Sequence, residues 1–478
     1  MRRSLCRALL LLCMIGSGAA FASTAHAQTR QEKSKPAAKP AKLTKPAKAV
    51  KPAKRAVSVE PKPGTRARIA AAAAAGAAGA AGAVAVSSST TPLVPNTAEA
   101  RLLDIIQLVK RQELDAALKG AAQLTADVPN FRAAQLVYAD LLRFKTGRMT
   151  GWANAPTSEV TQLLVKHVPA DPKVAPAPPQ ELQQQAHGLQ KELQRRVHGA
   201  GVLPAPAGSV PREFQSLGAS VRHAVAIDAS KSRLYLFSHE KGKLRLIGDF
   251  YISIGKFGMG KTLEGDQRTP QGVYFIGRQI PGPRLPEFYG KGALTLNYPN
   301  DWDKAVDRSG DGIWLHGSPP DQFARLPEAS DGCIVLANPD LILLMKTLDR
   351  QTPVLIRDKL QWAAPTERAQ AKTADTFAHV LDNWQQAWKA ADPGLLTKMY
   401  GQEPGADHQP KARLLEYFRF TDIGVQDLSV YSWKDPQGEV RIVDMQIGSR
   451  KAGKTLPLRQ YWRRMGDRWQ VLSEEIRG

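Results

Sequence analysis

Cysteine is nearly absent from this 478-residue chain, which contains three. Cys6 and Cys13 both lie in the first twenty residues, in a segment with a basic start, a short apolar run and the ending Ala25-His26-Ala27. This order predicts a cleavable secretory signal at residues 1–27. Without that signal the chain keeps only Cys333, so no internal disulfide is expected. A lone thiol in an oxidising compartment is a liability unless it does chemistry, which makes Cys333 the candidate nucleophile.

Acidic residues are scarce in residues 28–68, where thirteen Lys or Arg face only Glu32 and Glu60. This segment therefore carries half of the net charge of +22. Its Lys-Pro-Ala repeats exclude a regular helix, and we expect a disordered tail over residues 28–95. We interpret the tail as a solvated spacer, with attachment to an anionic envelope surface as the alternative. Nucleic acid is the usual partner of such a basic tail, but we do not expect it here, because the secretory signal predicts export from the compartment that holds nucleic acid.

Long hydrophobic runs are also missing, apart from the uncharged Ala- and Gly-rich stretch at residues 69–86. Alanine is barely apolar and glycine weakens helices, so a membrane anchor here is only the minor alternative. His167, His187 and His198 have no cysteine or acidic cluster at ligand spacing, and the sequence predicts neither a metal site nor a cofactor.

Residues 96–200 show apolar side chains at helical spacing, beginning with Leu102, Ile105, Ile106 and Val109. One helical hairpin in this region resembles a tetratricopeptide repeat, but a solenoid needs about three repeats. We therefore expect a small helical bundle or a dimerisation element.

From about residue 221 the apolar period changes from 3.6 to 2. Residues 224–228 and 233–237 predict a hairpin, and 244–247 and 250–254 predict two further strands. More short strands follow up to residue 357, with one helix at 339–349 that Asn338 is expected to cap. The pattern predicts a mostly β sandwich or barrel over residues 221–358.

Two glycine-flanked turns in this region contain the candidate catalytic residues. An apolar strand ends at His316-Gly317, and after a thirteen-residue loop the chain enters the next strand through Gly332-Cys333. A cysteine at a glycine-permitted turn and an imidazole that takes its proton are what nucleophilic thiol catalysis needs. The segment 265–272 reads as a structured loop, in which Arg268 either receives a substrate carboxylate or forms a salt bridge with Asp266 or a neighbour.

The ordered set Gly265-Asp266-x-Arg268-Thr269-Pro270-x-Gly272-x-Tyr274, Tyr298-Pro299-Asn300, His316-Gly317 and Ser330-x-Gly332-Cys333 resembles the L,D-transpeptidase catalytic domain of the YkuD type. The resemblance implies a cysteine acyl-transferase acting on peptidoglycan stem peptides, with Cys333 as nucleophile and His316 as base. It further implies that the Gly317 carbonyl orients the imidazole and that backbone N–H groups near Gly332 hold the oxyanion. Arg268, Ser330, Asp331 and Tyr298 are the candidate substrate-binding residues.

The segment departs from the usual family motif, because Asp331 replaces a histidine and Val335 an arginine. This variant looks like the YafK-like branch, which includes L,D-carboxypeptidases and lipoprotein-unlinking amidases. Residues 369–478 read as helices followed by a four-stranded meander, which resembles an NTF2-like α+β cone. The order of helical segment, YkuD-type sandwich and NTF2-like cone resembles the helical-cell-shape L,D-carboxypeptidases.

The resemblance implies release of D-alanine through a thioester, followed by transfer to water (tripeptide) or to an amine (3-3 cross-link). An amidase that frees wall-bound lipoprotein and a non-catalytic wall-binding scaffold are the alternatives. With the secretory signal, we expect a periplasmic or cell-envelope protein that modifies the wall and affects cell shape.

Overall fold

The computed structural model describes residues 98–146, 179–199, 206–374, 376–390, 392–401, 423–449 and 453–477. The predicted signal peptide at 1–27, the tail at 28–95 and His167 lie outside these residues. Among the described helices, none is long and apolar enough to cross a membrane.

The N-terminal part is helical, as the spacing of its apolar residues predicted. It contains α1 (Ala98–Lys110), α2 (Leu114–Asp127), α3 (Arg132–Lys145) and α5 (Pro179–Gly199). The apolar faces of the first three helices meet in one core that includes Leu102, Ile105, Leu124, Phe131 and Val137. Burial of these side chains holds helices of this length together, since they are marginal alone.

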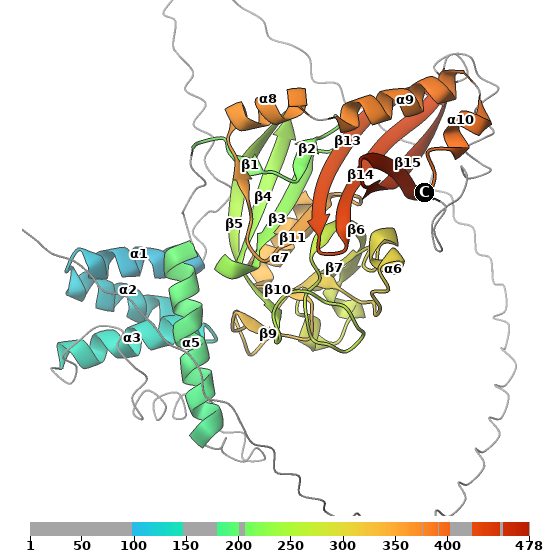
Figure 1. Cartoon of the computed structure of the whole chain (residues 1–478). Helices are drawn as coiled ribbons and strands as arrows, with labels where there is room; N and C mark the ends of the chain where they lie inside the picture. The colour runs from blue at the N-terminus through green and yellow to red at the C-terminus, as the bar shows by residue number, and fades with distance from the viewer. Residues whose placement is uncertain are drawn as a thin grey trace, which may run out of the picture. The chain divides into compact units, whose positions relative to one another are not determined.

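The central part is a nine-stranded sheet. Its strands are β3 (His223–Asp228), β4 (Arg233–Glu240), β5 (Lys243–Gly255), β6 (Gly272–Pro281), β7 (Gly292–Leu296), β8 (Trp314–His316), β9 (Glu328–Ser330), β10 (Ile334–Leu336) and β11 (Pro353–Arg357). They follow the order β10-β8-β7-β6-β11-β3-β4-β5-β9, and β10 pairs again with β5 (Figure 1). That last pairing joins β10, at one end of the sheet, to β5, the strand next to the other end, so the strands from β10 to β5 form a closed barrel.

Of the two architectures expected for this region, the structure has the barrel and not the sandwich, and the predicted strands are present. The reason lies in β5, which joins the two strands predicted at 244–247 and 250–254 into one strand of thirteen residues. Its first part pairs with β4, and Ile252 and Ser253 pair with β10. A strand long enough to pair on two sides can close a barrel, and closure removes unpaired sheet edges.

The interior of the barrel is filled by alternate side chains of these strands, among them Val225, Leu236, Ile252, Leu315 and Ile334. The predicted helix is α7 (Asn338–Thr347), and Leu341 and Leu344 on it complete this core. The predicted helix cap is wrong: Ala337 occupies the cap position, and the Asn338 side chain bonds elsewhere, as described below.

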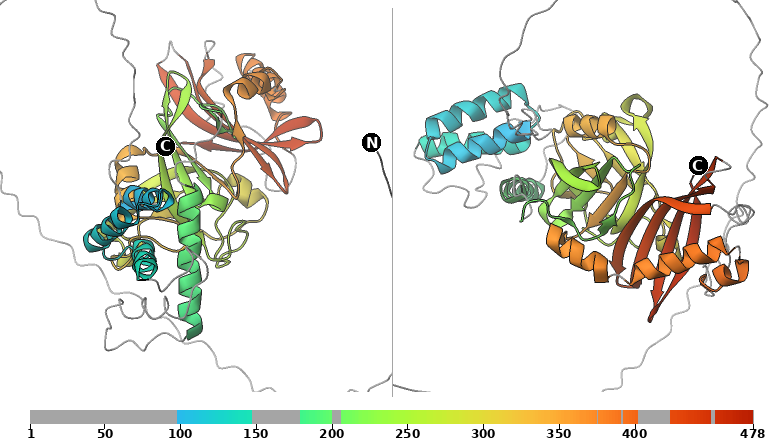
Figure 2. Two further views of the ribbon diagram at one scale, coloured as in Figure 1. Left: turned by 90° about the vertical axis from the view of Figure 1, so that its left-hand side faces the viewer. Right: turned by 90° about the horizontal axis from the view of Figure 1, so that it is seen from above.

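The C-terminal part contains the predicted meander as β13 (Ile423–Asp435), β14 (Gly438–Ser449), β15 (Lys454–Met465) and β16 (Arg468–Ile476). The helix α9 (Phe377–Lys389) runs across this sheet, orange over red in Figures 1 and 2, and buries Phe377, Trp384 and Trp388 against it. An unforeseen fifth strand, β2 (Phe214–Ser216), comes from the segment before the barrel and pairs with β13. The NTF2-like classification of this part stays a prediction.

Candidate active site

The strands β8 and β10 lie side by side and parallel, with Leu315 opposite Ile334 and His316 opposite Val335. Leu315 and Ile334 are fully buried in the barrel core. Their neighbours in the chain therefore face the other side of the sheet, and His316 and Cys333 share that side, two positions apart on adjacent strands. A strand spacing of about 4.8 Å and a rise of about 3.3 Å per residue place their Cα atoms about 8 Å apart, within reach of the two side chains.

His316 is buried, with 1% of its surface exposed. Its Nδ1 lies 2.8 Å from the carbonyl oxygen of Gly317. Because a carbonyl only accepts, Nδ1 carries the proton and Nε2 keeps its lone pair. Burial lowers the pKa of His316 to about 4; the Gly317 bond opposes this shift, and the charge of Arg325 adds to it. The imidazole is therefore neutral at pH 7, and Nε2 is free to accept a proton.

Cys333 is partly exposed, and its Sγ donates a hydrogen bond of 3.2 Å to the carbonyl of Gly312. Burial raises the pKa of the Cys333 thiol, against a backbone N–H of Trp314 that lowers it, and the charge of Asp331 raises it further. The resting nucleophile is thus a neutral thiol. The described interactions include no hydrogen bond between Cys333 and His316, so the thiol has to leave Gly312 before it can pass its proton to the imidazole.

The turn before the nucleophile requires glycine. Gly332 has a φ of +122°, and a Cβ there would lie 2.8 Å from the carbonyl oxygen of Arg268. The Gly332 N–H donates to Ser330 Oγ, and the Gly332 carbonyl accepts from Thr269 Oγ1. Ser330 is buried and its hydroxyl also donates to the Cys333 carbonyl, at 2.6 Å. The Ser330 hydroxyl therefore stabilises the turn before Cys333 through two hydrogen bonds. Its contact with substrate stays a prediction.

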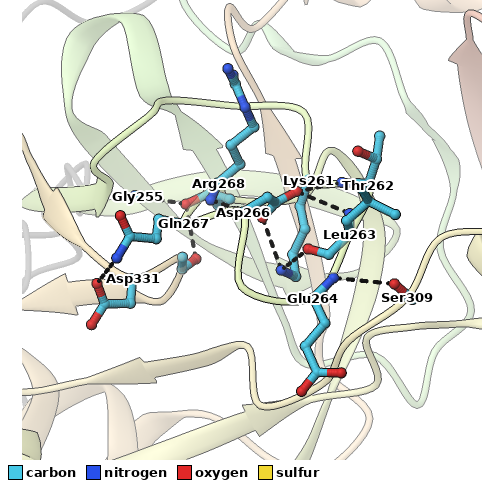
Figure 3. Close-up of polar contacts among 12 residues, drawn as sticks. Gly255, Lys261, Thr262, Leu263, Glu264, Asp266, Gln267, Arg268, Ser309 and Asp331 are labelled. Atoms are coloured by element: carbon cyan, nitrogen blue, oxygen red, sulfur yellow. Dashed lines mark hydrogen bonds and ion pairs between the residues drawn. The ribbon is translucent and has the colours of Figure 1, made fainter. Parts of the chain in front are cut away.

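One side of the site is formed by the β5–β6 loop (residues 256–271), whose centre is Asp266 (Figure 3). The Asp266 carboxylate accepts from the backbone N–H groups of Thr262, Leu263 and Arg268 and from Lys261 Nζ. Burial alone would raise the pKa of Asp266, but these donors hold it below its ordinary value of 3.8. The loop is thus ordered from within, as the sequence predicted.

Arg268 does not form the ion pair with Asp266 that we considered. Only its backbone N–H reaches that carboxylate, and its side chain points away from the Asp266 network in Figure 3. The guanidinium instead donates to the carbonyls of Phe257 and Met259, at 2.6 and 3.1 Å. Arg268 therefore ties together two parts of its own loop.

The two remaining substrate-binding candidates have different surroundings. Asp331 is exposed and accepts from Lys256 Nζ and Gln267 Nε2, at 3.1 and 2.9 Å. Tyr298 is buried in the barrel core, and its hydroxyl donates to the carbonyl of Ser309. Of the two, only Asp331 presents polar atoms to solvent.

The base–nucleophile loop (residues 317–332) is held by residues outside it. Asn338 Nδ2 donates to the Ser318 carbonyl, and Asn338 Oδ1 accepts from the Lys291 N–H, each at 2.8 Å. Tyr251 donates its hydroxyl to the Arg325 carbonyl at 3.0 Å. The contacts with the loop come from α7 and β5, and Asn338 is itself bonded to Lys291, directly before β7.

The helical part supports the same loop. Phe131, between α2 and α3, lies against Phe323 with ring centroids 4.3 Å apart, and the Phe323 N–H donates to the Asn130 carbonyl. Lys191 on α5 pairs with Glu328 at 2.6 Å. The chain between base and nucleophile is thus packed against helices that precede it by more than a hundred residues.

Sequence reasoning missed four residues around the site: Thr269, Tyr289, Arg325 and Asn338. Thr269 was within the Arg-Thr-Pro motif and carried a signal. Asn338 was read as a helix cap because it precedes a proline. Tyr289 and Arg325 lie in loops without a pattern of their own.

The cavity of about 190 Å³ found in the structure lies elsewhere, with a polar lining that includes Arg222, Asp349, Asp427 and Arg477. His316, Cys333 and the residues around them do not line this cavity. The candidate active site is therefore assigned from the chemistry of its thiol and imidazole and not from the size of a cavity. The described residues contain no group of three or more His, Cys, Asp or Glu placed to hold a metal ion.

The closed β barrel carries a neutral histidine at the end of β8 and a cysteine directly before the adjacent strand β10. Residues 222–356 match the family model of YkuD, the L,D-transpeptidase catalytic domain. The chain therefore contains an L,D-transpeptidase catalytic domain of the YkuD family, as the motifs implied. Such domains act on peptidoglycan, which supports an L,D-transpeptidase-type enzyme of the cell envelope.

Several solved structures are similar. Bd1075 of Bdellovibrio bacteriovorus is 24% identical over 56% of this chain and 98% of its own, with a TM-score of 0.44. The helical cell shape determining protein Pgp2 of Campylobacter jejuni is 22% identical over 60% of this chain and 100% of its own, with a TM-score of 0.43. An L,D-transpeptidase of Stackebrandtia nassauensis is 16% identical over 36% and 67%, with a TM-score of 0.23. No curated protein matches the chain.

Proposed function

We propose that this protein is a peptidoglycan-modifying cysteine acyl-transferase that cleaves the L-D bond of stem tetrapeptides. Cys333 is the nucleophile, His316 the general base, and Gly317 the residue that orients the base through its carbonyl. The observation that supports the proposal is the parallel pairing of β8, which ends at His316, with β10, which begins directly after Cys333, together with an unprotonated Nε2 on His316.

In the first half-reaction the thiol proton passes to His316 Nε2 as the sulfur attacks the carbonyl carbon of the L-centre at stem position three. A tetrahedral oxyanion forms and then collapses to a thioester. The bond to D-alanine breaks, and the departing amine takes the proton from His316. A general base is needed because the resting thiol is neutral.

The oxyanion needs a backbone donor beside the sulfur. The Gly332 N–H is already bonded to Ser330 Oγ. We therefore assign the oxyanion to the region of Gly332 with the Cys333 N–H as its donor.

In the second half-reaction the thioester is resolved by water, which gives a tripeptide, or by an amine of a neighbouring stem, which gives a 3-3 cross-link. His316 removes a proton from the incoming nucleophile and returns it to the sulfur. Both outcomes use the same residues, because the choice depends on which nucleophile reaches the thioester.

Further proposals concern the parts outside the barrel. We propose export by residues 1–27, a basic tail that acts as spacer or attaches to an anionic envelope surface, and a helical part that supports dimerisation. Sedimentation of the exported protein would test the last of these, and a monomer at all concentrations would contradict it.

Mass spectrometry of purified tetrapeptide muropeptides tests the central proposal. The wild type is expected to release D-alanine and yield tripeptides or tri–tetra dimers, whereas Cys333→Ala yields neither. Release of lipoprotein from sacculi without any action on tetrapeptides would favour the amidase. A Cys333→Ala protein that fully replaces the wild type in cells would favour the scaffold.

A further inference from the structure

Arg325 is a half-buried arginine on the base–nucleophile loop. Its Cζ lies 4.0 Å from the ring centroid of Phe288, and the same ring lies 5.9 Å from that of His316. The guanidinium is therefore at most about 10 Å from the imidazole. Tyr251 holds the Arg325 backbone through its hydroxyl, and Arg325 Nη1 makes one long bond of 3.4 Å to the Ala329 carbonyl. The side chain is fixed by stacking and the backbone by a hydrogen bond.

The acidic residues nearest to Arg325 in sequence are Glu328, Asp321 and Asp331, and each has another partner: Asp321 accepts from Gln322 Nε2. Burial lowers the pKa of Arg325, and the charges of Asp331 and Asp321 oppose that shift from a distance. Glu328 pairs with Lys191 and also with Arg195 on α5. Asp331 accepts from Lys256 and Gln267 across the site. Within the part of the chain that the structure describes, no carboxylate lies within 4 Å of the Arg325 guanidinium.

The other cations beside the nucleophile already have partners. Lys261 is buried and pairs with Asp266, and Lys256 pairs with Asp331. The Arg268 guanidinium donates to backbone carbonyls of its own loop. Among the cations, the charge of Arg325 lowers the pKa of the Cys333 thiol more than that of Lys261 does.

We propose that Arg325 binds the terminal carboxylate of the donor stem peptide, which belongs to the D-amino acid that leaves. This inference rests on the proposed function. A guanidinium that is fixed on an aromatic ring and has no described carboxylate within 4 Å offers a paired set of donors that fits a carboxylate. In a peptide, the carboxylate carbon of the last residue lies within about 4 Å of the preceding carbonyl carbon. Arg325 can therefore reach this group while the sulfur attacks that carbonyl.

This role explains why the site would act on a free stem terminus. A donor peptide that continues beyond position four, or whose terminus is amidated, lacks the charge that Arg325 is placed to meet. The alternatives are that Arg325 stabilises the Cys333 thiolate or only packs on Phe288. Neither alternative depends on the charge of the substrate terminus.

The test compares two substrates and four forms of the full-length exported protein. The substrates are the disaccharide tetrapeptide ending in D-alanine and the same compound ending in D-alaninamide. The proteins are the wild type, Arg325→Gln, Arg325→Lys and the control Arg350→Gln, which changes an exposed arginine outside the site. Release of D-alanine or D-alaninamide gives kcat and KM, and iodoacetamide labelling against pH gives the pKa of Cys333.

We expect the wild type and Arg350→Gln to favour the acid over the amide by about 10- to 100-fold in kcat/KM, mostly through KM. Arg325→Gln should lose that factor on the acid and cleave both substrates alike, and Arg325→Lys should fall between them because it keeps the charge without the paired donors.

Three results would overturn the inference. If the wild type cleaves acid and amide equally, the proposed function stands but Arg325 does not read the terminus. If Arg325→Gln loses equal activity on both substrates while the pKa of Cys333 rises, Arg325 serves the thiolate. If the wild type releases nothing from either substrate, the proposed function fails, and this inference fails with it.

Discussion

The two loops that meet at Cys333 are ordered in opposite ways. The β5–β6 loop is ordered from within, because Asp266 accepts from its own backbone and Arg268 donates to its own carbonyls. The base–nucleophile loop has most of its anchors elsewhere: Asn338 on α7, Tyr251 on β5 and the helical part around Phe131. The first is a local structure, and the second is a product of tertiary packing.

This difference teaches where catalytic geometry is set. The β5–β6 loop can keep its shape when distant residues change, and it touches the nucleophile through Thr269 and Gly332. The base–nucleophile loop connects His316 to Cys333, so its distant anchors should influence the geometry of both residues. Changes in the base–nucleophile loop should therefore lower mainly the activity. Changes in the β5–β6 loop should lower mainly the free energy of unfolding.

The largest effect is expected for His316→Asn, which removes the base and leaves a side chain of similar size. We expect kcat/KM to fall by about 10²- to 10⁴-fold, because general-base catalysis contributes this much. Arg268→Gln in the β5–β6 loop is the matched comparison and should retain at least about a third of the activity. Steady-state release of D-alanine measures both, and a His316→Asn protein with more than a tenth of wild-type activity would contradict the assignment.

Lowering the pH should have different effects on the base–nucleophile loop and on the β5–β6 loop. The pKa of His316 is lowered to about 4 by burial, so its neutral form is lost only as the pH falls through that value. We expect kcat/KM to be flat near pH 6.5 and to fall about tenfold per unit below pH 4. The pKa of His316 is lower in the folded protein than in the unfolded chain, so the free energy of unfolding is highest above pH 6.5. This contribution of His316 to the free energy of unfolding is lost as the pH falls from 6.5 to 4. Asp266, with its pKa below 3.8, should keep the β5–β6 loop ordered until lower pH. An acid limb at pH 6.5 in a pH–rate profile would refute this.

Asn338→Ala tests the external support of the base–nucleophile loop. It removes the donor to the Ser318 carbonyl and the acceptor for the Lys291 N–H. We expect the free energy of unfolding to fall by about 1–3 kcal/mol and kcat to fall by about tenfold. Urea denaturation and initial rates measure the two quantities. Asn338→Asp keeps the acceptor and should recover part of the stability; an unchanged kcat in Asn338→Ala would show that the loop does not need this anchor.

Thr269→Val breaks the link between the two loops. The buried Thr269 hydroxyl donates to the Gly332 carbonyl and accepts from the Gly255 N–H. Its loss should lower the free energy of unfolding by about 1–3 kcal/mol, since two buried backbone groups lose their partner. The effect on kcat should stay within about threefold, and Thr269→Ser should behave as wild type. A loss of kcat larger than that of Asn338→Ala would reverse the comparison.

The smallest effects are expected at the contact with the helices. Phe323→Ala removes the ring that packs on Phe131 and should lower kcat about two- to fivefold while amide exchange in the base–nucleophile loop becomes faster. Lys191→Ala removes only an exposed ion pair with Glu328 and should change stability by less than about 1 kcal/mol. Equal behaviour of the two variants would mean that aromatic packing does not hold the loop.

Much of the architecture could be predicted from the sequence, because it depends on local periodicity. The change of apolar period near residue 221, the helical spacing before it and the C-terminal meander all appear as predicted. The sequence also predicted that the turn before Cys333 needs a glycine. The structure agrees, because Gly332 has a φ of +122°, which disfavours other residues. The choice between sandwich and barrel was not predictable, because closure depends on one long strand meeting β10, far away in sequence.

The sequence by itself indicated the candidate reacting groups: one thiol at a Gly-Cys corner that opens an apolar run and one imidazole at a His-Gly corner that closes another. Their motifs also determined the family. Only the tertiary structure decided that the two corners lie on adjacent parallel strands and that burial keeps His316 neutral. It also decided that Arg268 is bound to its own loop, while Arg325 stacks on Phe288 and has no ion pair among the described residues. The physical reason is that burial and charge pairing depend on neighbours that the fold brings together, whereas turns and strand periods are properties of consecutive residues.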